Sequence, residues 1–198
     1  MIEQPPIQPT PVGALRFNTD SKQLEYFDGG QYVNITTDSP NRNTGGTRGL
    51  FCRGRTPSNV DTIDFVNIDS TGNAIDFGNL TESGWGPAAM SNSVRGVYAG
   101  RLSPGSPGFE TTIDYITIAS TGNAFDFGDT TTGSGRGTGS SNKTRGVFIL
   151  GNAAPSPNIQ NHIDYITIAT TGNAKDFGDL VSRTHQAGST SDSHGGLG

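Results

Sequence analysis

Apolar and polar residues alternate along a stretch that occurs three times in this chain, at 63–80, 113–130 and 163–180. In the middle copy Ile113, Tyr115 and Thr117 alternate with Asp114, Ile116 and Ile118, a period of two that predicts a β-strand. The Ser-Thr-Gly-Asn that follows favours a tight reversal, and Ala-x-Asp-Phe-Gly predicts the return strand of a hairpin. A lone hairpin is marginal in water, so we expect the hairpins to cover one another.

A third strand is predicted upstream of each hairpin, at Thr47–Phe51, Val94–Tyr98 and Thr144–Phe148. The polar stretch between copies, as at Arg183–Thr190, is long enough for a fourth. Four short strands in about 50 residues make one propeller blade, and their order resembles a kelch-type blade. The sequence therefore predicts an all-β fold with three such repeats. Alternatives left open are a ring completed by partners, a fragment of a longer repeat protein, and a closed threefold fold, either a β-trefoil or a β-prism.

The N-terminal part has a different pattern. Residues 1–10 contain three prolines and predict an extended arm. Residues 11–37 predict a three-stranded β-meander with turns at Thr19–Lys22 and Asp28–Gly30. Residues 38–46 form a linker, and 47–198 hold the repeats, the last ending as a fourth begins. The meander's expected apolar face, which so small a sheet cannot bury alone, consists of Leu15, Phe17, Leu24, Tyr26, Tyr32 and Ile35.

The meander resembles a module common in fibre and appendage proteins of tailed bacteriophages. The resemblance rests on Gly13-Ala14-Leu15-Arg16-Phe17-Asn18-Thr19-Asp20, on Leu24–Gly29 and on Tyr32-Val33, with Tyr32 where the module usually has Trp. The repeats resemble tandem repeats in virion proteins of cyanophages. These resemblances imply a virion structural protein, made in the host cytoplasm and homotrimeric. They also imply attachment to capsid, neck or tail proteins through the N-terminal region, with a distal repeat domain that contacts the host, including a surface glycan.

Composition and charge argue against some classes of binding partner. The net charge is −5 with no Lys/Arg block, so we expect neither a nucleic-acid groove nor attraction to anionic membranes. Cys52 is the only cysteine, which predicts a small buried side chain rather than a catalytic thiol. Hydrophobic residues make up only 31% of the chain, so its stability should come from stacked repeats.

Charged residues recur with the repeats, as Arg48, Arg95 and Arg145, and as Asp64, Asp114 and Asp164. An Arg and a carboxylate in every copy predict a structural pair or hairpin cap used once per unit, because catalysis needs one asymmetric constellation. The recurrent Asp-Phe-Gly also occurs in protein kinases, but the phosphate loop and the strand lysine of a kinase do not accompany it here, so it does not indicate a kinase. Trp85 lies in a loop without counterpart, where it either packs between units or, if exposed, stacks on a sugar.

These observations predict a non-enzymatic virion protein without catalytic residues, metal or cofactor. Two alternatives stay open. The first is a carbohydrate-binding receptor module with Trp85 as a glycan contact. The second is a glycan-cleaving propeller enzyme, which requires two carboxylates across a groove.

Overall fold

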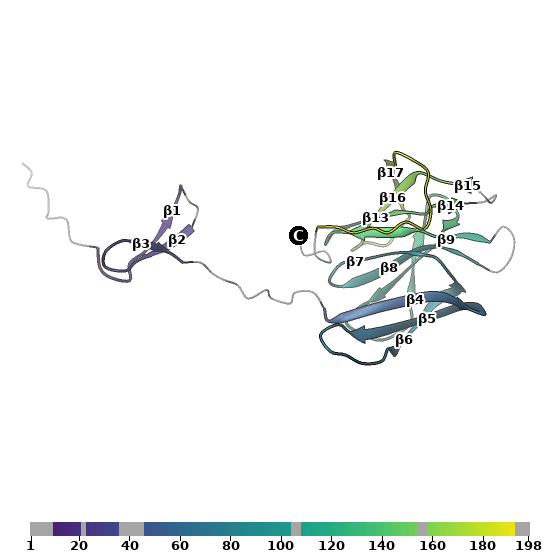
Figure 1. Ribbon diagram of the computed structural model, residues 1–198, viewed down its shortest axis with the longest axis horizontal. Coiled ribbons are helices and arrows are strands. Elements are labelled where there is room, and N and C mark those ends of the chain that lie inside the picture. Colours follow the sequence, from purple (N-terminus) through teal and green to yellow (C-terminus); the bar gives the residue numbers. More distant parts are fainter. Residues whose placement is uncertain (1–9, 21–22, 36–45, 104–107, 154–157, 193–198) are drawn as a thin grey trace, which may run out of the picture. The chain divides into compact units, whose positions relative to one another are not determined.

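The computed structural model describes residues 10–20, 23–35, 46–103, 108–153 and 158–192. The chain forms two compact units, Met1–Arg42 and Asn43–Gly198. The predicted arm and linker lie almost wholly outside the described residues. Every regular element among the described residues is a β-strand, so the predicted all-β class is confirmed (Figure 1). The described part of the chain has no helix long and apolar enough to cross a membrane.

The N-terminal unit is the predicted meander. Its three strands are β1 (Leu15–Asn18), β2 (Gln23–Phe27) and β3 (Tyr32–Asn34), paired antiparallel in that order. Asp28 shapes the second turn, because its Oδ1 accepts hydrogen bonds from the amides of Gly30 (2.8 Å) and Gln31 (2.9 Å). Turn chemistry of this kind depends on neighbouring residues alone. The sequence therefore predicts where the turns, and with them the three strands, lie.

The second unit, the repeat domain, consists of three main antiparallel sheets, which we call layers 1, 2 and 3. Layer 1 contains β4 (Arg48–Thr56), β5 (Ser58–Asn67) and β6 (Ile75–Gly84). Layer 2 contains β7 (Ala88–Ser91), β8 (Arg95–Leu102), β9 (Phe109–Thr117) and β10 (Phe125–Asp129). Layer 3 contains β12 (Thr138–Ser141), β13 (Arg145–Ile149), β16 (His162–Thr167) and β17 (Lys175–Asp179). A short sheet consists of β11 (Ser134–Gly135), β14 (Asn152–Ala153) and β15 (Asn158–Ile159).

The strand register gives each layer two different faces. In layer 2, Val97 lies opposite Tyr115 and Ala99 opposite Ile113, so these four side chains share one face. Tyr98 lies opposite Asp114 and Gly96 opposite Ile116, on the other face. The first face packs on layer 3 and the second on layer 1. We call them the forward face and the backward face.

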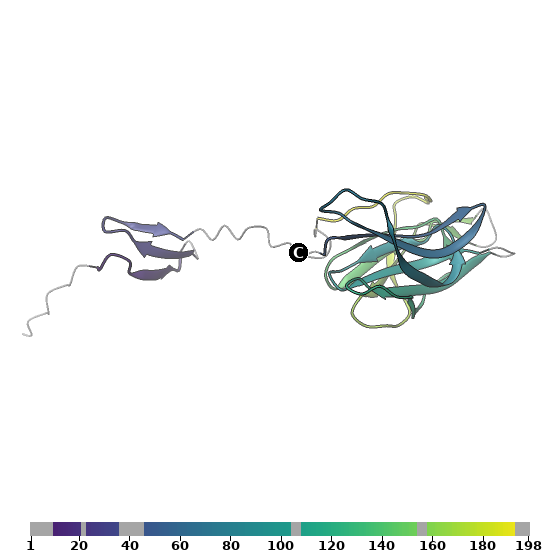
Figure 2. The same ribbon diagram turned by 90° about the horizontal axis from the view of Figure 1, so that it is seen from below.

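The layers stack one on another (Figures 1 and 2). Forward and backward faces meet to form two hydrophobic cores between them. Between layers 1 and 2, the buried members are Ile63, Phe77, Leu80, Tyr98 and Ile116. Between layers 2 and 3, they include Val97, Ile113, Phe127, Phe148, Ile166, Ile168 and Ala174. These cores show the stacking of repeats that the sequence predicts.

A backbone contact accompanies each core. The turn Gly122–Ala124 of layer 2 lies along Phe77–Asn79 of layer 1. The Gly122 amide donates to the Phe77 carbonyl (2.8 Å), the Ala124 amide donates to the Asn79 carbonyl (2.8 Å), and the Asn79 amide donates to Asn123 Oδ1 (3.0 Å). The same three bonds join Gly172–Ala174 of layer 3 to Phe127–Asp129 of layer 2, at 2.7, 2.7 and 3.1 Å. We call these segments the docking turn and the receiving strand.

The docking turn corrects the prediction of a tight reversal. The chain between β9 and β10 is longer than a two-residue turn, and its second half, through Ala124, bonds to the neighbouring layer instead of closing its own hairpin. Local propensity alone predicts a tight reversal at Ser, Thr, Gly and Asn. Their conformation is set by hydrogen bonds to residues 44 positions away.

The row of layers is open at both ends. Phe177 of layer 3 is 51% exposed, although its equivalents Phe77 and Phe127 are each 2% exposed. On the backward face of layer 1, Phe51 is 62% exposed and Ile68 67%. A β-trefoil or a β-prism closes its three units on one another, so neither alternative describes this architecture.

Candidate functional site

The recurrent arginines form bonds between layers. Arg48 Nη1 donates to the Ile118 carbonyl of layer 2 (2.6 Å), and Arg95 Nη1 donates to the Ile168 carbonyl of layer 3 (3.0 Å). Each guanidinium also lies over an aromatic ring of its own layer, Arg95 at 4.5 Å from the Tyr115 centroid. Arg145 lies in the same way over Tyr165, at 4.7 Å, on the forward face of layer 3.

The recurrent aspartates bond in the opposite direction. Asp114 is buried and accepts a hydrogen bond from Thr81 Oγ1 of the preceding layer at 2.6 Å. Asp164 accepts from Thr131 Oγ1, equivalent to Thr81, at 2.8 and 2.9 Å. A burial cost for each carboxylate is thus offset by a hydroxyl donor. Sequence reasoning missed these threonines, although their 50-residue spacing was available as a signal.

Of the two roles predicted for these residues, the Arg–Asp pair within each unit is wrong. Arg95 lies opposite Thr117 and shares the forward face with Tyr115, whereas Asp114 lies opposite Tyr98 on the backward face. Side chains on opposite faces of one sheet cannot form an ion pair. The same register separates Arg145 from Asp164 and Arg48 from Asp64. Both residue types recur because each internal junction uses an arginine of the preceding layer and an aspartate of the following layer.

Thr131, His162 and Asp164 combine a hydroxyl, an imidazole and a carboxylate. Thr131 Oγ1 lies 2.8 Å from His162 Nε2, and the same nitrogen lies 2.7 Å from Asp164 Oδ1. Nε2 therefore contacts both partners. The other ring nitrogen, Nδ1, lies 3.7 Å from Asp176 Oδ1, too far for the hydrogen bond that a proton relay through the two nitrogens requires. The cavity beside them measures about 10 Å³, which admits at most one water. The cluster is a junction contact like Thr81–Asp114, extended by a histidine.

Trp85 lies at the connection between layers 1 and 2. It forms an antiparallel bridge with Leu102, the counterpart of the Gly135–Asn152 pair in the next repeat. The Arg136 guanidinium lies 5.0 Å from the Trp85 ring centroid, which places a cation over one face of the half-buried ring. This geometry matches packing between neighbouring repeats, with one face of the ring covered by the guanidinium.

The meander presents its apolar face to solvent. Leu15 lies opposite Tyr26 and Phe17 opposite Leu24, so all four share one face, and Leu15 and Phe17 are 64% and 61% exposed. Ile35 continues the same face by its alternation with Val33, which lies opposite Tyr26. Tyr32 does not belong to it, contrary to the prediction. Its partner in the register is Phe27 on the other face, and Arg16 covers its ring at 3.6 Å.

The other face of the meander holds a polar network. Glu25 is buried and accepts hydrogen bonds from Asn18 Nδ2 (2.9 Å) and Arg16 Nε (2.7 Å). The bonds from Asn18 and then from Arg16 hold the pKa of Glu25 below its ordinary value, because they stabilise the charged carboxylate. This network fixes which face is polar and therefore which face stays apolar and exposed.

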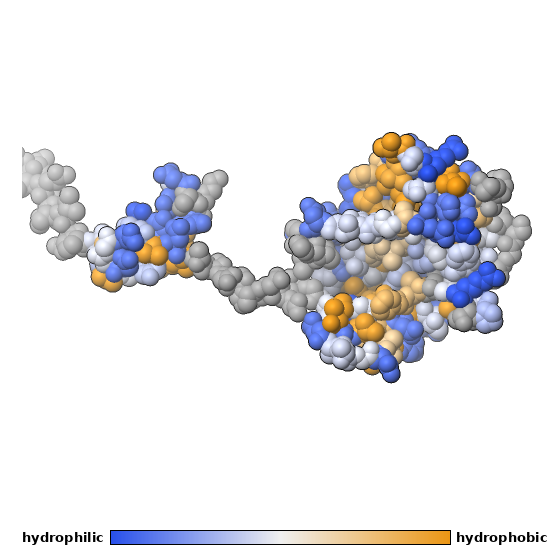
Figure 3. All heavy atoms as spheres, in the orientation of Figure 1, coloured by the Kyte–Doolittle hydropathy of each residue, from blue (hydrophilic) through white to orange (hydrophobic). Residues whose placement is uncertain are grey.

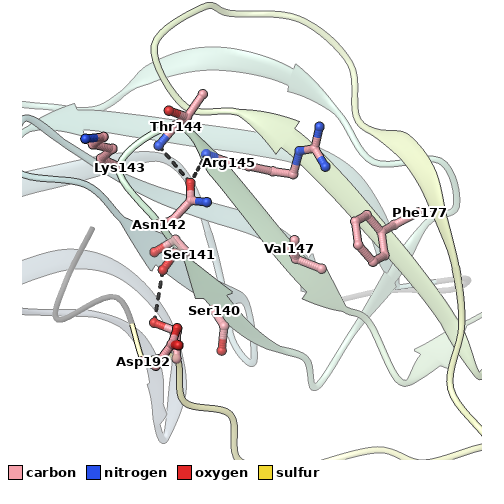
Figure 4. A pocket seen from close by; sticks show the side chains of 10 residues that line it. Ser140, Ser141, Asn142, Lys143, Thr144, Arg145, Val147, Phe177 and Asp192 are labelled. Atoms are coloured by element: carbon pink, nitrogen blue, oxygen red, sulfur yellow. Dashed lines mark hydrogen bonds between the residues drawn. The ribbon is translucent and has the colours of Figure 1, made fainter. Parts of the chain in front are cut away.

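A hollow of about 540 Å³ lies on the forward face of layer 3 (Figure 4). Its walls include Val147, Phe177 and the β12–β13 turn, in which Asn142 Oδ1 accepts from the amides of Thr144 (2.9 Å) and Arg145 (2.7 Å). Ser191 closes another side and donates to the Ser141 carbonyl (3.0 Å). Hydrophobic residues also lie at the surface over layers 1 and 3 in Figure 3. The hollow occupies the place that a following layer fills at the two internal junctions.

Within the described residues, no group of three His, Cys, Asp or Glu side chains is placed to hold a metal ion. No protein-family model matches this sequence, and none of the curated proteins matches it. The candidate functional features are therefore three surfaces defined by geometry alone: the apolar face of the meander, the backward face of layer 1 and the forward face of layer 3.

Proposed function

We propose that this chain is a non-enzymatic structural protein of a tailed-bacteriophage virion, a fibre, appendage or decoration protein. The meander attaches it to the particle, and the repeat domain projects for host adhesion or surface coverage. The observation that carries the proposal is the exposed apolar face of the meander, because a three-stranded sheet of this size needs a partner to cover such a face.

The partner that we propose is the same face of two further copies, which makes a homotrimer. Three identical sheets around a threefold axis bury Leu15, Phe17, Leu24 and Tyr26 against their own equivalents, while the Glu25 network keeps the outer faces polar. A threefold attachment region on other virion proteins of the capsid, neck or tail fits this arrangement.

The repeat domain supports a scaffolding role. Its recurrent Arg, Asp and Thr side chains serve the junctions between layers, as the bonds of Arg95, Asp114 and Thr131 illustrate. A scaffold of this kind holds the connecting loops in place for binding. The Arg136 guanidinium over Trp85 favours packing between repeats as the role of this ring over a glycan contact.

The first test is the mass of the full chain in solution by light scattering. The proposal expects a species of three times the 20.7 kDa of one chain. Phe17→Lys should abolish the trimer by placing a charge on the apolar face, whereas Gln23→Lys, on the polar face, should leave it intact. A wild-type mass that Phe17→Lys leaves unchanged contradicts attachment through this face.

Attachment to a particle needs its own test. Immunogold labelling with antibodies against the repeat domain should decorate purified virions of the phage that encodes the chain. Labelling confined to infected-cell debris, with bare virions, overturns the virion assignment even if the chain is a trimer.

A further inference from the structure

The two ends of the repeat domain carry the two halves of a junction that occurs twice within it. On the forward face of layer 3, Val147, Ile163, Tyr165 and Phe177 stand where layer 2 has Val97, Ile113, Tyr115 and Phe127. On the backward face of layer 1, Phe51, Val66, Ile68 and Ala74 stand where layer 3 has Phe148, Ile166, Ile168 and Ala174. Internally the second set covers the first, whereas at the ends Phe51, Ile68 and Phe177 are exposed.

The backbone groups of the contact are also present at both ends. Gly178 has φ 139°, close to the 147° of Gly78 and the 143° of Gly128. An added Cβ on Gly78 or Gly128 would lie 2.4 or 2.6 Å from the carbonyl oxygen of a docking turn, but around Gly178 nothing lies within 4 Å. The receiving strand of layer 3 thus has the conformation of an occupied one. Around Gly72 of the matching turn, Gly72–Ala74, nothing lies within 4 Å of an added Cβ, as is also true of the docked Gly122 and Gly172, so this side of the turn imposes no steric limit.

The sequence of the layer 1 turn matches that of a docking turn, so it indicates which segment fits the receiving strand of layer 3. Ser70–Ala74 reads STGNA, identical to Ser120–Ala124, which docks on layer 1. Asn73 therefore supplies the Oδ1 that Asn123 and Asn173 supply internally. Arg145, equivalent to Arg95, has its counterpart acceptor in the Ile68 carbonyl, as Arg95 has the Ile168 carbonyl.

A segment equivalent to β7 and β12 lies beyond layer 3. Ser191 Oγ donates to the Ser141 carbonyl (3.0 Å), just as Ser141 Oγ donates to the Ser91 carbonyl (2.6 Å) one layer earlier. Residues 189–191 thus stack on β12 as β12 stacks on β7. Layer 1 has three strands among the described residues and lacks the strand that β7 and β12 provide in layers 2 and 3.

We propose that a second copy of this chain stacks head to tail on layer 3, its Gly72–Ala74 turn docking on Phe177–Asp179 and its layer 1 covering the hollow of Figure 4. Residues 189–191 of the first copy then lie beside β4 of the second, in the place that β7 and β12 take beside β8 and β13. The contact joins two different surfaces, so it generates a ring if the rotation closes and a filament if it does not.

One position departs from the internal pattern. Val181 stands where Thr81 and Thr131 donate a hydroxyl to the aspartate of the next layer. At the new junction Asp64 retains only the amide of residue 181, the bond that Thr131 N forms to Asp164 Oδ2 (3.1 Å). The contact between copies should therefore be weaker than the internal junctions. Val181→Thr restores the hydroxyl and should strengthen association about fivefold.

A disulfide tests the contact directly. With Cys52→Ser as background, Asn73→Cys and Asp179→Cys in one full-length chain place cysteines on the two surfaces that the proposal brings together. On a denaturing, non-reducing gel we expect products of two or more chain masses that a thiol reductant returns to one. This readout does not depend on the meander, because non-covalent association is lost in denaturant.

An internal junction provides the matched control. Asn79→Cys with Asn123→Cys occupies the equivalent positions, where the Asn79 amide bonds Asn123 Oδ1 at 3.0 Å. This variant should form its disulfide within one chain, with loss of free thiol and no change in mass. If it forms and the Asn73→Cys, Asp179→Cys chain stays monomeric, the head-to-tail contact is overturned.

Mixing separates head-to-tail from face-to-face pairing. Chains with only Asn73→Cys and chains with only Asp179→Cys should each stay monomeric on the gel, and their mixture should give a product of two chains. A dimer from either variant alone indicates pairing of like surfaces and overturns the proposal. Phe177→Lys in the Asp179→Cys chain should reduce the mixed product at least tenfold, because it places a charge in the apolar contact.

Discussion

Gly128 stands where the backbone of layer 2 meets the backbone of layer 3. Asp126 Oδ1 accepts the Gly128 amide (3.1 Å), Phe127 enters the core, and the glycine leaves room for the docking turn. The recurrent Asp-Phe-Gly is thus a junction motif in which each residue has a separate task. Positive φ and the close carbonyl both require glycine at this position.

Gly128→Ala should lower the free energy of unfolding by ~3–5 kcal/mol, from the strained φ and the clash with the Gly172 carbonyl. Gly178→Ala is the matched control, because φ is similar but no atom lies within 4 Å. It should cost only the strain of ~1–3 kcal/mol. Urea unfolding at low protein concentration measures both. Equal losses would show that the close backbone approach contributes nothing to stability.

Glu25 is the residue whose charge state matters most for the meander. Its pKa is below the ordinary 4.5 in the folded state, so the unfolded state binds more protons as the pH falls. The stabilisation is present above pH ~4.5 and is lost as the pH falls through the folded pKa. Asn18→Ala should raise the pKa of Glu25 towards 4.5 in an NMR titration, since Asn18 is the largest cause of the shift.

Asp28 is the internal control for that titration. Its pKa is lowered by the amides of Gln31 and Gly30, which Asn18→Ala does not touch. The pKa of Asp28 should therefore stay low in the variant. A Glu25 pKa that does not move would show that Asn18 does not stabilise the carboxylate.

At the scale of the elements, each layer is a two-sided unit whose faces carry different polar residues. Arginine extends forward to a carbonyl of the next layer, and aspartate accepts from a threonine of the preceding one. Bonds of this kind fix the register between layers, because the apolar cores alone would tolerate sliding.

Arg95→Ala should destabilise the repeat domain by ~1.5–3 kcal/mol, because the bond to the Ile168 carbonyl and the contact over Tyr115 are both lost. Arg145→Ala removes the equivalent ring contact over Tyr165, on a face that no layer of the described residues covers, and should cost ~0.5–1 kcal/mol. Thermal or urea unfolding compares the two. A larger loss for Arg145→Ala would contradict the role of the interlayer bond.

At the scale of the whole repeat domain, stability is a sum over layers and the junctions between them. Layer 2 has neighbours on both sides, whereas layers 1 and 3 have one each. Opening should therefore begin at the end layers, and the end surfaces should be the most dynamic part of the isolated domain.

Amide hydrogen exchange measures this gradient. In the Ile68→Glu variant, which blocks stacking between copies, the docking-turn amides of Gly122, Ala124, Gly172 and Ala174 should be protected by their interlayer bonds. The amides of Gly72 and Ala74 should exchange rapidly. Equal protection of Gly72 and Gly122 in this variant would contradict the assignment of the docking bonds.

The sequence by itself determined the repeat, its period, the meander and the strands of the hairpins. The fourth strand predicted at Arg183–Thr190 is wrong, because the structure has no strand at these residues. The alternation at 113–118 and the turn chemistry at Asp28 are local signals, and local signals suffice for elements whose hydrogen bonds are made within a hairpin. The all-β class followed from these elements. Strand β2 (Gln23–Phe27) fills the whole stretch between the two predicted turns of the meander.

Only the tertiary structure decided which surfaces meet. Arg95 and Asp114 recur together in the sequence, but strand register places them on opposite faces, and register depends on a single-residue offset that composition does not reveal. Register likewise moved Tyr32 off the apolar face of the meander. The roles of the docking turn and of the glycine in Asp-Phe-Gly depend on a neighbouring layer 44 to 50 residues away. Local propensity does not predict these roles, because the backbone hydrogen bonds involved are made between layers.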